Sequence, residues 1–493
     1  VVTAVDSNGN ESPASSSASV TNNLLVAGAF NRVTWSAVTG AKRYRVYQKE
    51  TGLYGLVGTV DAAIGTTFDH TGDVAPDLGL SPPEVDSDFV GVSKPAAGCF
   101  FEGRAVFADG QDLWMTRSGT DDDMSYHLPL QDSDRIYAPI TSLRRCEIRH
   151  CVPLGHLLLL TSVGTFRVTP INTDALTPES VASRPQGYTG SSRVEPLVAS
   201  STILFAAARG GHVREMGFAV QSDGFVTTDL SLRAAHLFDG LDIVQSAYQQ
   251  SPWPTGWWVS SNGRLLALTY IPEEQLTCWQ WMDTDGSFES VATNQDGDSD
   301  SIWAVVLRTI NGSQVRYIEV MVPTSTVALE DWIGADSSIT YDGAPATVIS
   351  GLGHLEGKAV AVLADGKVQA QKTVSGGQIT LDTAASTVHV GIPFAYQVWP
   401  LPPAFQIVGF GSGRPKTVNR CWVRVTDSAR FKLGRDPSSL YESSEIGAGE
   451  LFTGLVDVAF ASAWEQDSTV CIEQSDPLPL TVVSVTAEVA MGG

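Results

Sequence analysis

Turn glycines that recur about every fifty residues constrain the fold of this chain more than any other feature of its sequence. They lie between runs of strand-forming residues, 47 to 54 residues apart, at Gly110, Gly164, Gly211, Gly263 and Gly312. Evenly spaced hairpins are typical of a β-propeller, in which a four-stranded blade buries its apolar faces only by stacking on the next blade. We therefore predict a propeller. A large sandwich whose hairpins are evenly spaced is the alternative.

The rest of the sequence is also rich in strand signals. Val, Ile, Thr, Tyr, Phe and Trp cluster in short runs punctuated by D-G, N-G and G-G turns. The best helical candidate, residues 229–238, is short enough to be a single turn in a loop. Gly366 continues the spacing, but periodicity does not decide whether it belongs to another blade or to a new domain. The predicted fold class is all-β.

Two alternating strands near the start of the chain, residues 31–35 and 40–47, contain the pattern W…G-A-x-x-Y-x-V-Y. Tyr44 and Val46 share one face of the second strand. This pattern resembles a fibronectin type III-like sandwich. The first twenty residues, with a predicted hairpin turn at Asn8 and Gly9, resemble the last hairpin of a preceding copy.

The sequence therefore predicts four parts. Residues 1–25 are the end of a preceding fibronectin III-like unit, and residues 26–85 are a fibronectin III-like domain that ends in a proline-rich linker at 75–86. Residues 86–325 form the propeller blades. Residues 326–493 form a compact C-terminal β domain, with completion of the propeller or of a platform as its alternative role.

Charge and apolar runs exclude two classes of protein. Lys and Arg number 31 against 54 Asp and Glu, so the formal net charge is −23 and bulk affinity for nucleic acid is not expected. The longest apolar stretches, residues 157–160 and 203–208, are far shorter than the roughly 18 residues that a membrane-spanning helix needs. We expect no membrane-spanning segment.

The cysteines and the N-terminus indicate where the protein is made. None of the six cysteines forms a C-x-x-C pair, and they are too few for a disulfide scaffold, so we expect reduced thiols in a protein assembled inside a cell. No signal peptide is visible at the start. Because the sequence opens at Val1, inside a predicted strand and without an initiator Met, we expect a fragment or a processed product.

Motifs for catalysis and phosphate binding are incomplete. The run G-F-G-S-G at residues 409–413 misplaces its serine, Ser412, for a nucleophile elbow and has no helix after it. The run G-H-L-E-G-K-A at 353–359 has one residue too few and ends in Ala359, so it is a turn before a strand and not a P-loop. Paired carboxylates for glycoside hydrolysis are not excluded among 54 acids, but no sialidase-type S-x-D-x-G-x-x-W box is present.

Three clusters could hold a ligand, and each has a plainer explanation. In an extended chain Cys146, His150 and His156 point one way and Cys151 the other, but no second pair of ligands completes a zinc site. The alternating aspartates Asp296, Asp298 and Asp300 lack the Gly and Glu of a calcium loop, and residues 121–123 are an acidic turn. Five bunched tryptophans either stack sugars or, as we favour, fill blade interfaces: Trp253, Trp257, Trp258, Trp279 and Trp281.

From these observations we predict that the chain has no catalytic, cofactor-binding or metal-binding residues. The chain is accordingly predicted not to be an enzyme and to need no cofactor.

Several phrases in order along the chain carry a more specific signal. They are D-L-W-M-T-R-S-G (112–119), L-L-L-L-T-S-V-G-T-F-R-V (157–168), G-G-H-V-R-E-M-G (210–217), D-L-S followed by A-H-L-F (229–238), W-A-V-V-L-R-T-I-N-G (303–312), R-Y-I-E (316–319) and G-L-G-H-L-E-G (351–357). Their order and spacing resemble the tail nozzle, or tail tubular, proteins of short-tailed bacteriophages over roughly residues 95–490.

The resemblance implies a structural virion protein in the phage tail, assembled in the cytoplasm of the host bacterium. Such proteins form a hexameric ring of identical chains below the head–tail adaptor. They extend the channel through which genomic DNA passes without specific binding, and they contact tail fibres or a tail plug. An acidic lumen would let DNA slide, because it repels phosphates. The alternative is a carbohydrate-binding or glycan-cleaving β-propeller protein, with acids and tryptophans converging on a pocket at the propeller axis.

Overall fold

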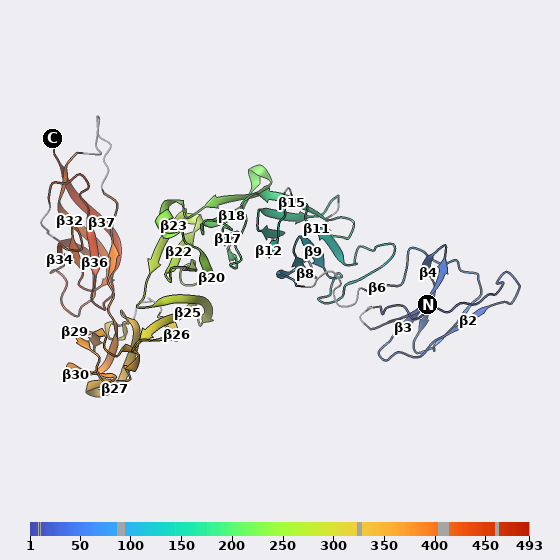
Figure 1. The fold of residues 1–493 in the computed structure, drawn as a ribbon, viewed down its shortest axis with the longest axis horizontal. Helices are drawn as coiled ribbons and strands as arrows, with labels where there is room; N and C mark the ends of the chain where they lie inside the picture. The colour runs from blue at the N-terminus through green and yellow to red at the C-terminus, as the bar shows by residue number, and fades with distance from the viewer. Residues whose placement is uncertain are drawn as a thin grey trace. The chain divides into compact units, whose positions relative to one another are not determined.

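The computed structural model describes residues 1–492 except 8, 10, 86–93, 143, 173, 323–327, 403–413 and 459–462 (Figure 1). The chain divides into two compact units, Val1–Tyr248 and Gln249–Gly493. Nearly all regular structure is strand. The helical segments are single 3₁₀ turns or little more: η2 (Val220–Ser222), η3 (Leu232–Leu237), η4 (Pro272–Glu274), η5 (Leu329–Asp331) and η6 (Gly353–Leu355). Among the described residues no helix is long and apolar enough to span a bilayer.

Unit 1 begins with a small sandwich of two sheets. One sheet has the order β1 (Val2–Val5), β3 (Arg43–Glu50), β4 (Leu53–Asp61), and the other pairs β2 (Asn31–Thr34) with β5 (Thr67–His70). Val2, Tyr44 and Val46 from the first sheet share a core with Val33 and Phe68 from the second. Tyr44 and Val46 lie on one buried face, as the alternation predicts. The fibronectin III-like sandwich is therefore confirmed.

The predicted boundary at residue 25 is corrected. β1 pairs along its length with β3, from Val2 opposite Val46 to Val5 opposite Arg43, and its side chains enter the same core. The chain also returns after the predicted turn, with Glu11 bridged to Val5, although Asn8 itself lies outside the described residues. The first strand thus completes this sandwich instead of ending another unit, because long-range pairing with β3 buries its apolar side chains.

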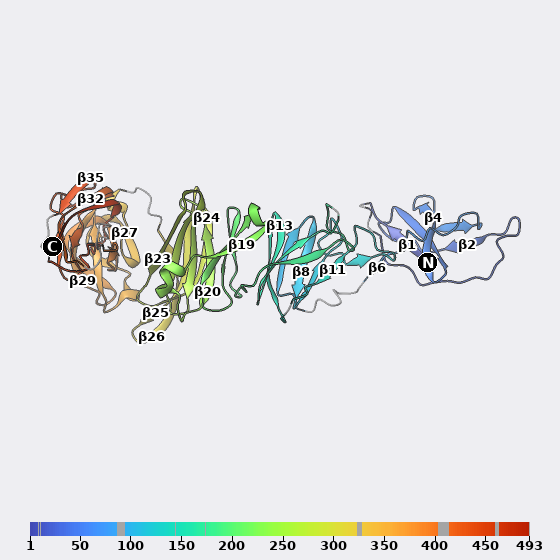
Figure 2. The same cartoon turned by 90° about the horizontal axis from the view of Figure 1, so that it is seen from above.

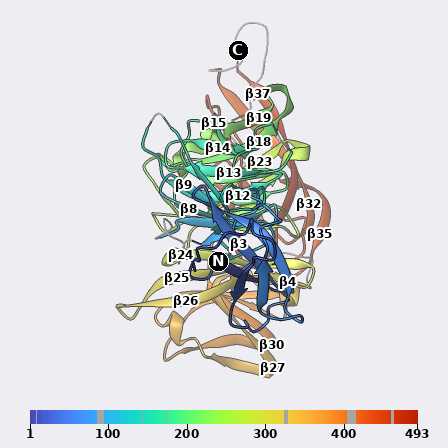
Figure 3. The same cartoon turned by 90° about the vertical axis from the view of Figure 1, so that its right-hand side faces the viewer.

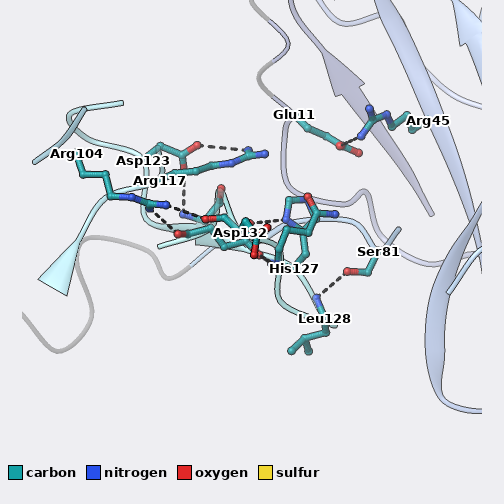
Figure 4. A network of polar contacts seen from close by, with 12 residues as sticks. Glu11, Arg45, Ser81, Arg104, Arg117, Asp123, His127, Leu128 and Asp132 are labelled. Atoms are coloured by element: carbon teal, nitrogen blue, oxygen red, sulfur yellow. Dashed lines mark hydrogen bonds and ion pairs between the residues drawn. The ribbon is translucent and has the colours of Figure 1, made fainter. Parts of the chain in front are cut away.

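The predicted linker is hydrogen-bonded on both sides. The amide of Leu56 in β4 donates to the carbonyls of Asp77 and Leu80, at 3.1 Å each. Further along, β6 (Glu84–Val85) pairs with β10 (Ser125–Tyr126). The hydroxyl of Ser81 accepts a 2.7 Å hydrogen bond from the amide of Leu128 (Figure 4). Residues 75–85 are therefore built into unit 1, whereas Asp86 lies outside the described residues.

Three four-stranded antiparallel meanders follow in unit 1. In each, the strands pair in the order in which they occur along the chain; β10 is not part of the first because it pairs with β6. The first is β7 (Ala97–Phe101), β8 (Arg104–Asp109), β9 (Asp112–Met115), β11 (Ile136–Pro139); the second β12 (Ile148–Leu154), β13 (His156–Thr161), β14 (Thr165–Thr169), β15 (Ala182–Gly187); the third β16 (Leu197–Ala199), β17 (Thr202–Ala206), β18 (Val213–Ala219), β19 (Gly224–Asp229). The unit ends within β20 (Ile243–Gln249).

These meanders stack face to face as propeller blades do. In β13, Leu157 and Leu159 belong to a core shared with the first blade, while Leu158 and Leu160 belong to a core shared with the third. Successive side chains of a strand point to opposite faces, so one strand serves two cores. Because both faces of β13 are buried, all four positions from Leu157 to Leu160 are apolar.

The turn glycines occupy one place in this repeat. Gly110, Gly164 and Gly211 lie between the second and third strands of their blades. Gly110 and Gly211 have φ of 63° and 64°, a conformation that favours glycine. Gly164 differs, because a Cβ there would meet the carbonyl oxygen of Gly187 at 2.6 Å. The regular spacing therefore marks the same position in each blade. Glycine is required there either by a positive φ, as at Gly110 and Gly211, or by close approach of another backbone, as at Gly164.

Unit 2 begins with two further antiparallel meanders. One contains β21 (Thr255–Ser260), β22 (Leu265–Ile271) and β23 (Leu276–Met282). The other is a three-stranded sheet of β24 (Ser287–Asp296), β25 (Ser299–Ile310) and β26 (Ser313–Met321), seen in Figure 2. Gly263 lies in the turn between β21 and β22 and Gly312 in the turn between β25 and β26, with φ of 80° and 78°.

The remaining sheets have a different topology. One has the order β27 (Asp336–Ser350), β30 (Gln378–Ile392), β28 (Ala359–Ala364), β29 (Lys367–Thr373), and the β27–β30 pair is seen in Figure 3. Gly366 turns between β28 and β29, so it lies in a sheet whose strand order is not that of a simple meander. The last two sheets are β31 (Tyr396–Val398), β36 (Cys471–Gln474), β33 (Lys432–Gly434), β34 (Leu440–Glu442), and β35 (Phe452–Val458), β32 (Lys416–Ser428), β37 (Thr481–Met491).

These last two sheets share one core, with Val423 and Val456 from one sheet and Leu433 and Ile472 from the other. The predicted fold class is confirmed: the chain is all-β, with propeller-type blades, a fibronectin III-like sandwich and C-terminal β structure. The boundary between the two compact units lies inside the range predicted for the propeller. The predicted ranges 86–325 and 326–493 otherwise stay predictions.

Candidate functional site

The sheet β24–β26 has an apolar face that the described residues leave exposed. Trp303 lies opposite Val320, and Val305 lies opposite Ile318, so these four side chains share one face. Ile318 is 75% exposed, Val320 45% and Trp303 41%. We call these four residues the outer face. An antiparallel sheet with one side in water normally carries polar residues on that side, so this face is suited to association.

The opposite face of the same sheet is a true core face. Val291, Ile302 and Val306 are buried there. In the earlier blades, by contrast, the central strands are buried on both faces, as in β17 and β21. A blade in a stack is covered on both sides, and β24–β26 is covered on one.

Local sequence explains why the outer face forms. The run from Ile302 to Leu307 is apolar at every position, so pairing in either register would present apolar side chains on both faces. Asn311 and Gly312 both have positive φ, 49° and 78°, which is the backbone of a type I′ turn that suits a two-residue hairpin. The turn fixes the register and therefore which residues share the face.

Ion pairs frame this sheet. At the rim, Arg316 donates to both carboxylate oxygens of Glu289, and this hydrogen bond lowers the pKa of Glu289. Beneath the sheet, Arg308 is 3% exposed and donates to the carboxylates of Glu319 and Asp336. Burial alone would lower the pKa of Arg308, but these hydrogen bonds outweigh it and raise the pKa. Arg308 thus fixes β25 and β26 to the first residue of β27.

The tryptophan cluster is divided between core and surface. Trp257 and Trp258 are buried, as the blade-interface interpretation predicts, and Trp258 contacts the ring of Trp279. Trp253 is 64% exposed and Trp281 44% exposed. The guanidinium of Arg264 lies 4.2 Å from the ring centre of Trp281. Two of the five rings are therefore available for stacking on a ligand.

A cavity of about 490 Å³ opens on the first blade, lined by Cys99, Phe100, Phe107, Asp121 and Asp122 among others. The loop that carries the two aspartates is held by Arg104, which is 4% exposed (Figure 4). Its Nη1 donates to the carbonyls of Thr116 and Asp134 at 2.7 and 2.6 Å, and its Nη2 donates to that of Asp132 at 2.9 Å. Burial lowers the pKa of Arg104.

The same loop contains a buried His–Asp pair. Nδ1 of His127 lies 2.7 Å from Oδ1 of Asp134, and Oδ2 of Asp134 accepts the amides of His127 and Gln131. Burial alone would raise the pKa of Asp134, but these hydrogen bonds outweigh it and lower the pKa. Both side chains are almost fully buried, so this pair stabilises the loop and does not face the cavity.

The structure does not bring together the three residues that were weighed as zinc ligands, Cys146, His150 and His156. Cys146 is buried and accepts a hydrogen bond from Gln111, while Nε2 of His150 lies 2.9 Å from the carbonyl oxygen of Ser192. His156 contacts the rings of Phe218 and Phe225. No group of three metal-ligating side chains occurs in the part of the chain that the structure describes.

The other motifs have structural roles or lie outside the described residues. The carboxylate of Asp300 accepts hydrogen bonds from the amides of Gln250 and Ser251, Asp296 is the last residue of β24, and Asp298 lies in the turn that leads to β25. Residues 353–359 form η6 and lead into β28, as predicted for a turn before a strand. Residues 409–413, with Ser412, are outside the described residues.

Comparison with known proteins gives matches only among solved structures: no family model and no curated protein matches the chain. A luciferin-regenerating enzyme is 11% identical, with 63% of this chain and 95% of that chain covered and a TM-score of 0.24. An exo-β-1,3-galactanase from Phanerochaete chrysosporium is 9% identical, with 79% and 96% covered and a TM-score of 0.21. An arabinoxylan arabinofuranohydrolase of glycoside hydrolase family 43 from Bacillus subtilis is 10% identical, with 80% and 93% covered and a TM-score of 0.19.

This comparison corrects one prediction. The chain was predicted from its sequence not to be an enzyme, and all three of these structures are described as enzymes, so that prediction is contradicted. Two of them are described as enzymes that act on carbohydrates, and none of the three is described as a phage tail protein. At a TM-score of 0.24 or lower, the likeness transfers no activity or substrate to this chain.

Sequence reasoning missed the outer face. Its signal is the unbroken apolar run around Trp303, but an apolar run in a strand does not reveal which of its two faces stays uncovered.

Proposed function

We propose that the chain is a nozzle-type subunit of a phage tail, which assembles with further copies of itself into a ring around a DNA channel. The observation that carries the proposal is the outer face of β24–β26. Blade faces are normally covered by the next blade, and here Trp303, Ile318 and Val320 are exposed, with Val305 half-buried beside them. In a ring, a neighbouring subunit supplies that cover through a contact between two different surfaces.

The resemblance in sequence order and spacing, from residue 112 to 357, supports the same assignment. The net charge of −23 agrees with a protein that DNA passes without adhering, since it offers no release of counterions. In this proposal the head–tail adaptor and the fibre or plug proteins bind other surfaces of the ring.

The test is electron-microscopy class averaging of the full chain, alone and mixed with the adaptor ring and the other tail proteins. We expect rings with an axial channel when the other tail proteins are present. Ile318→Asp places a charge in the outer face and is expected to abolish ring formation. Val348→Asp, at a strand position that is 48% exposed outside the outer face, is the matched control and should leave rings intact. Single particles even with the complete tail would contradict the proposal.

The second candidate is a carbohydrate-binding or glycan-cleaving propeller protein. The exposed rings of Trp253 and Trp281 favour it, because flat aromatic faces with an accessible side can stack on sugars. Binding of the full chain to a glycan array, lost in Trp281→Ala and retained in Trp303→Ala, would support this candidate. Absence of binding to every glycan would remove it.

A further inference from the structure

The first blade has an aromatic face on the side opposite to its core with the second blade. Phe107 lies opposite Trp114 in the sheet and Trp114 lies opposite Tyr137, and the ring centres of Trp114 and Tyr137 are 4.4 Å apart. The next residue along β9, Met115, points the other way into the core shared by the two blades. Together with Phe100 on β7, these three aromatic residues form what we call the first-blade face.

Part of this face is exposed and hollowed. Phe100 is 70% exposed and Tyr137 47%. The rings of Phe100 and Phe107 both line the 490 Å³ cavity. Gly98, which lies opposite Phe107, also lines the cavity and has no side chain to fill it. Two aromatic walls are therefore open to a ligand.

Two carboxylates lie at the same cavity. Asp121 and Asp122 line it, and both residues are exposed. Neither carboxylate forms an ion pair or a hydrogen bond with another residue that the structure describes, whereas the neighbouring Asp123 pairs with Arg117. The cavity thus combines aromatic walls with two negative charges that the described part of the chain leaves uncompensated.

The loop that carries these carboxylates is held in place by its backbone. The amide of Gly119 donates to the carbonyl of Gly103 at 2.7 Å, and the amide of Arg117 donates to the carbonyl of Asp123 at 2.8 Å. Buried Arg104 binds three further carbonyls beside it. A ligand therefore meets carboxylates that are already positioned, which lowers the entropy lost on binding.

The first-blade face already accommodates one planar cation of the chain itself. The guanidinium of Arg135 lies 4.3 Å from the ring centre of Tyr126 and 5.5 Å from that of Trp114. A guanidinium is planar and more weakly hydrated than an ammonium, so it packs well against aromatic rings. The cavity offers rings of the same kind and, in addition, two carboxylates.

We propose that this cavity binds the side chain of an arginine presented by a partner protein. The guanidinium packs against Phe100 and Phe107, and its N–H groups donate to the carboxylates of Asp121 and Asp122. Lysine is the poorer ligand, because its ammonium has no planar surface to place on a ring. The site lies wholly in unit 1 and does not depend on ring assembly.

The experiment is isothermal titration calorimetry of the full chain at low ionic strength. The probe is the peptide acetyl-Gly-Arg-Gly-amide, compared with the same peptide carrying citrulline or lysine in place of arginine. Citrulline resembles arginine in shape but is uncharged. We expect the arginine peptide to bind about tenfold more tightly than the citrulline peptide, since charge-assisted hydrogen bonds are lost with the charge. It should also bind more tightly than the lysine peptide, and its affinity should fall as salt is added.

Substitutions at exposed positions locate the site without disturbing the core. The double variant Asp121→Asn, Asp122→Asn and the single variant Phe100→Ala should each weaken binding of the arginine peptide. Asp174→Asn removes an exposed carboxylate elsewhere in unit 1, and Tyr188→Ala removes a ring that is 83% exposed. These two are the matched controls and should bind the peptide as the wild type does.

Four outcomes would overturn the proposal. They are the absence of binding by the arginine peptide, equal affinity for the arginine and citrulline peptides, full affinity in the double aspartate variant, and full affinity in Phe100→Ala. An equal loss in Asp174→Asn would overturn it as well, because the net charge of −23 would then attract the peptide without a specific site.

Discussion

At Arg308 a full positive charge is buried beneath the outer face, and the carboxylates of Glu319 and Asp336 make that burial tolerable. Removing one partner of a buried ion pair typically costs about 3–5 kcal/mol, because the other charge stays buried and unpaired. Arg308→Met should therefore destabilise β25 and β26 by roughly that amount. Hydrogen exchange of peptides from these strands measures it. Arg316→Met, which breaks only the exposed pair with Glu289, is the control and should show no measurable change.

The His212 ring adds a dependence on pH. Its two nitrogens lie 3.1 Å from carboxylate oxygens of Asp239 and Asp229, and the hydrogen bonds to these groups raise the pKa of His212. A raised pKa in the folded state means that the stabilisation is complete below the unfolded value of about 6.5 and is lost as the pH rises through the folded value. The melting temperature should fall from pH 6 to pH 9, and less so in His212→Gln. Parallel curves for the two proteins would contradict this.

Neighbouring glycines in the third blade separate two physical effects at the level of one hairpin. Gly210 and Gly211 both have positive φ, but a Cβ at Gly210 meets nothing within 4 Å, whereas at Gly211 it would clash with the carbonyl oxygen of Leu241. Gly210→Ala should cost about 1–2 kcal/mol, the price of a left-handed alanine. Gly211→Ala should cost clearly more, since backbone must also move. Thermal unfolding of the two variants measures the difference, and equal losses would show that the contact with Leu241 is easily relieved.

The element level also shows what sequence can predict. The hairpins around Gly110 and Gly211 were predictable because strand runs, turn residues and spacing are local signals. The order β27–β30–β28–β29 was not, since it depends on which strand returns to which edge, and the turn at Gly366 resembles those of the blades. The core that Cys99 and Cys151 share depends likewise on the stacking of whole sheets. The exposed Ile318 was ambiguous for a related reason: an apolar residue in a strand does not reveal what covers it.

For the molecule as a whole, apolar association and charge repulsion act against each other. A net charge of −23 on every copy opposes contact between copies, while the outer face favours it. Salt shortens the screening length from about 10 Å at 0.1 M to about 3 Å at 1 M. Sedimentation velocity should therefore show more self-association of the full chain at 1 M NaCl than at 0.1 M. Ile318→Asp should show no such increase, and an increase equal to that of the wild type would exclude the outer face as the contact.

The contrast between meanders and interleaved sheets has a consequence for synthesis on the ribosome. In a blade each strand pairs with the strand just made, so β13 can fold onto β12 while the rest of the chain is still being translated. β32 has no such neighbour, because its two partners come later: β35 starts at Phe452, and β37 starts at Thr481, 53 residues after Ser428. During that interval the apolar side chains of β32 lack their cover. We therefore expect translation speed and chaperone access to affect the folding of this last sandwich most. The blades can form their strand pairs, and so avoid aggregation, soon after they emerge from the ribosome.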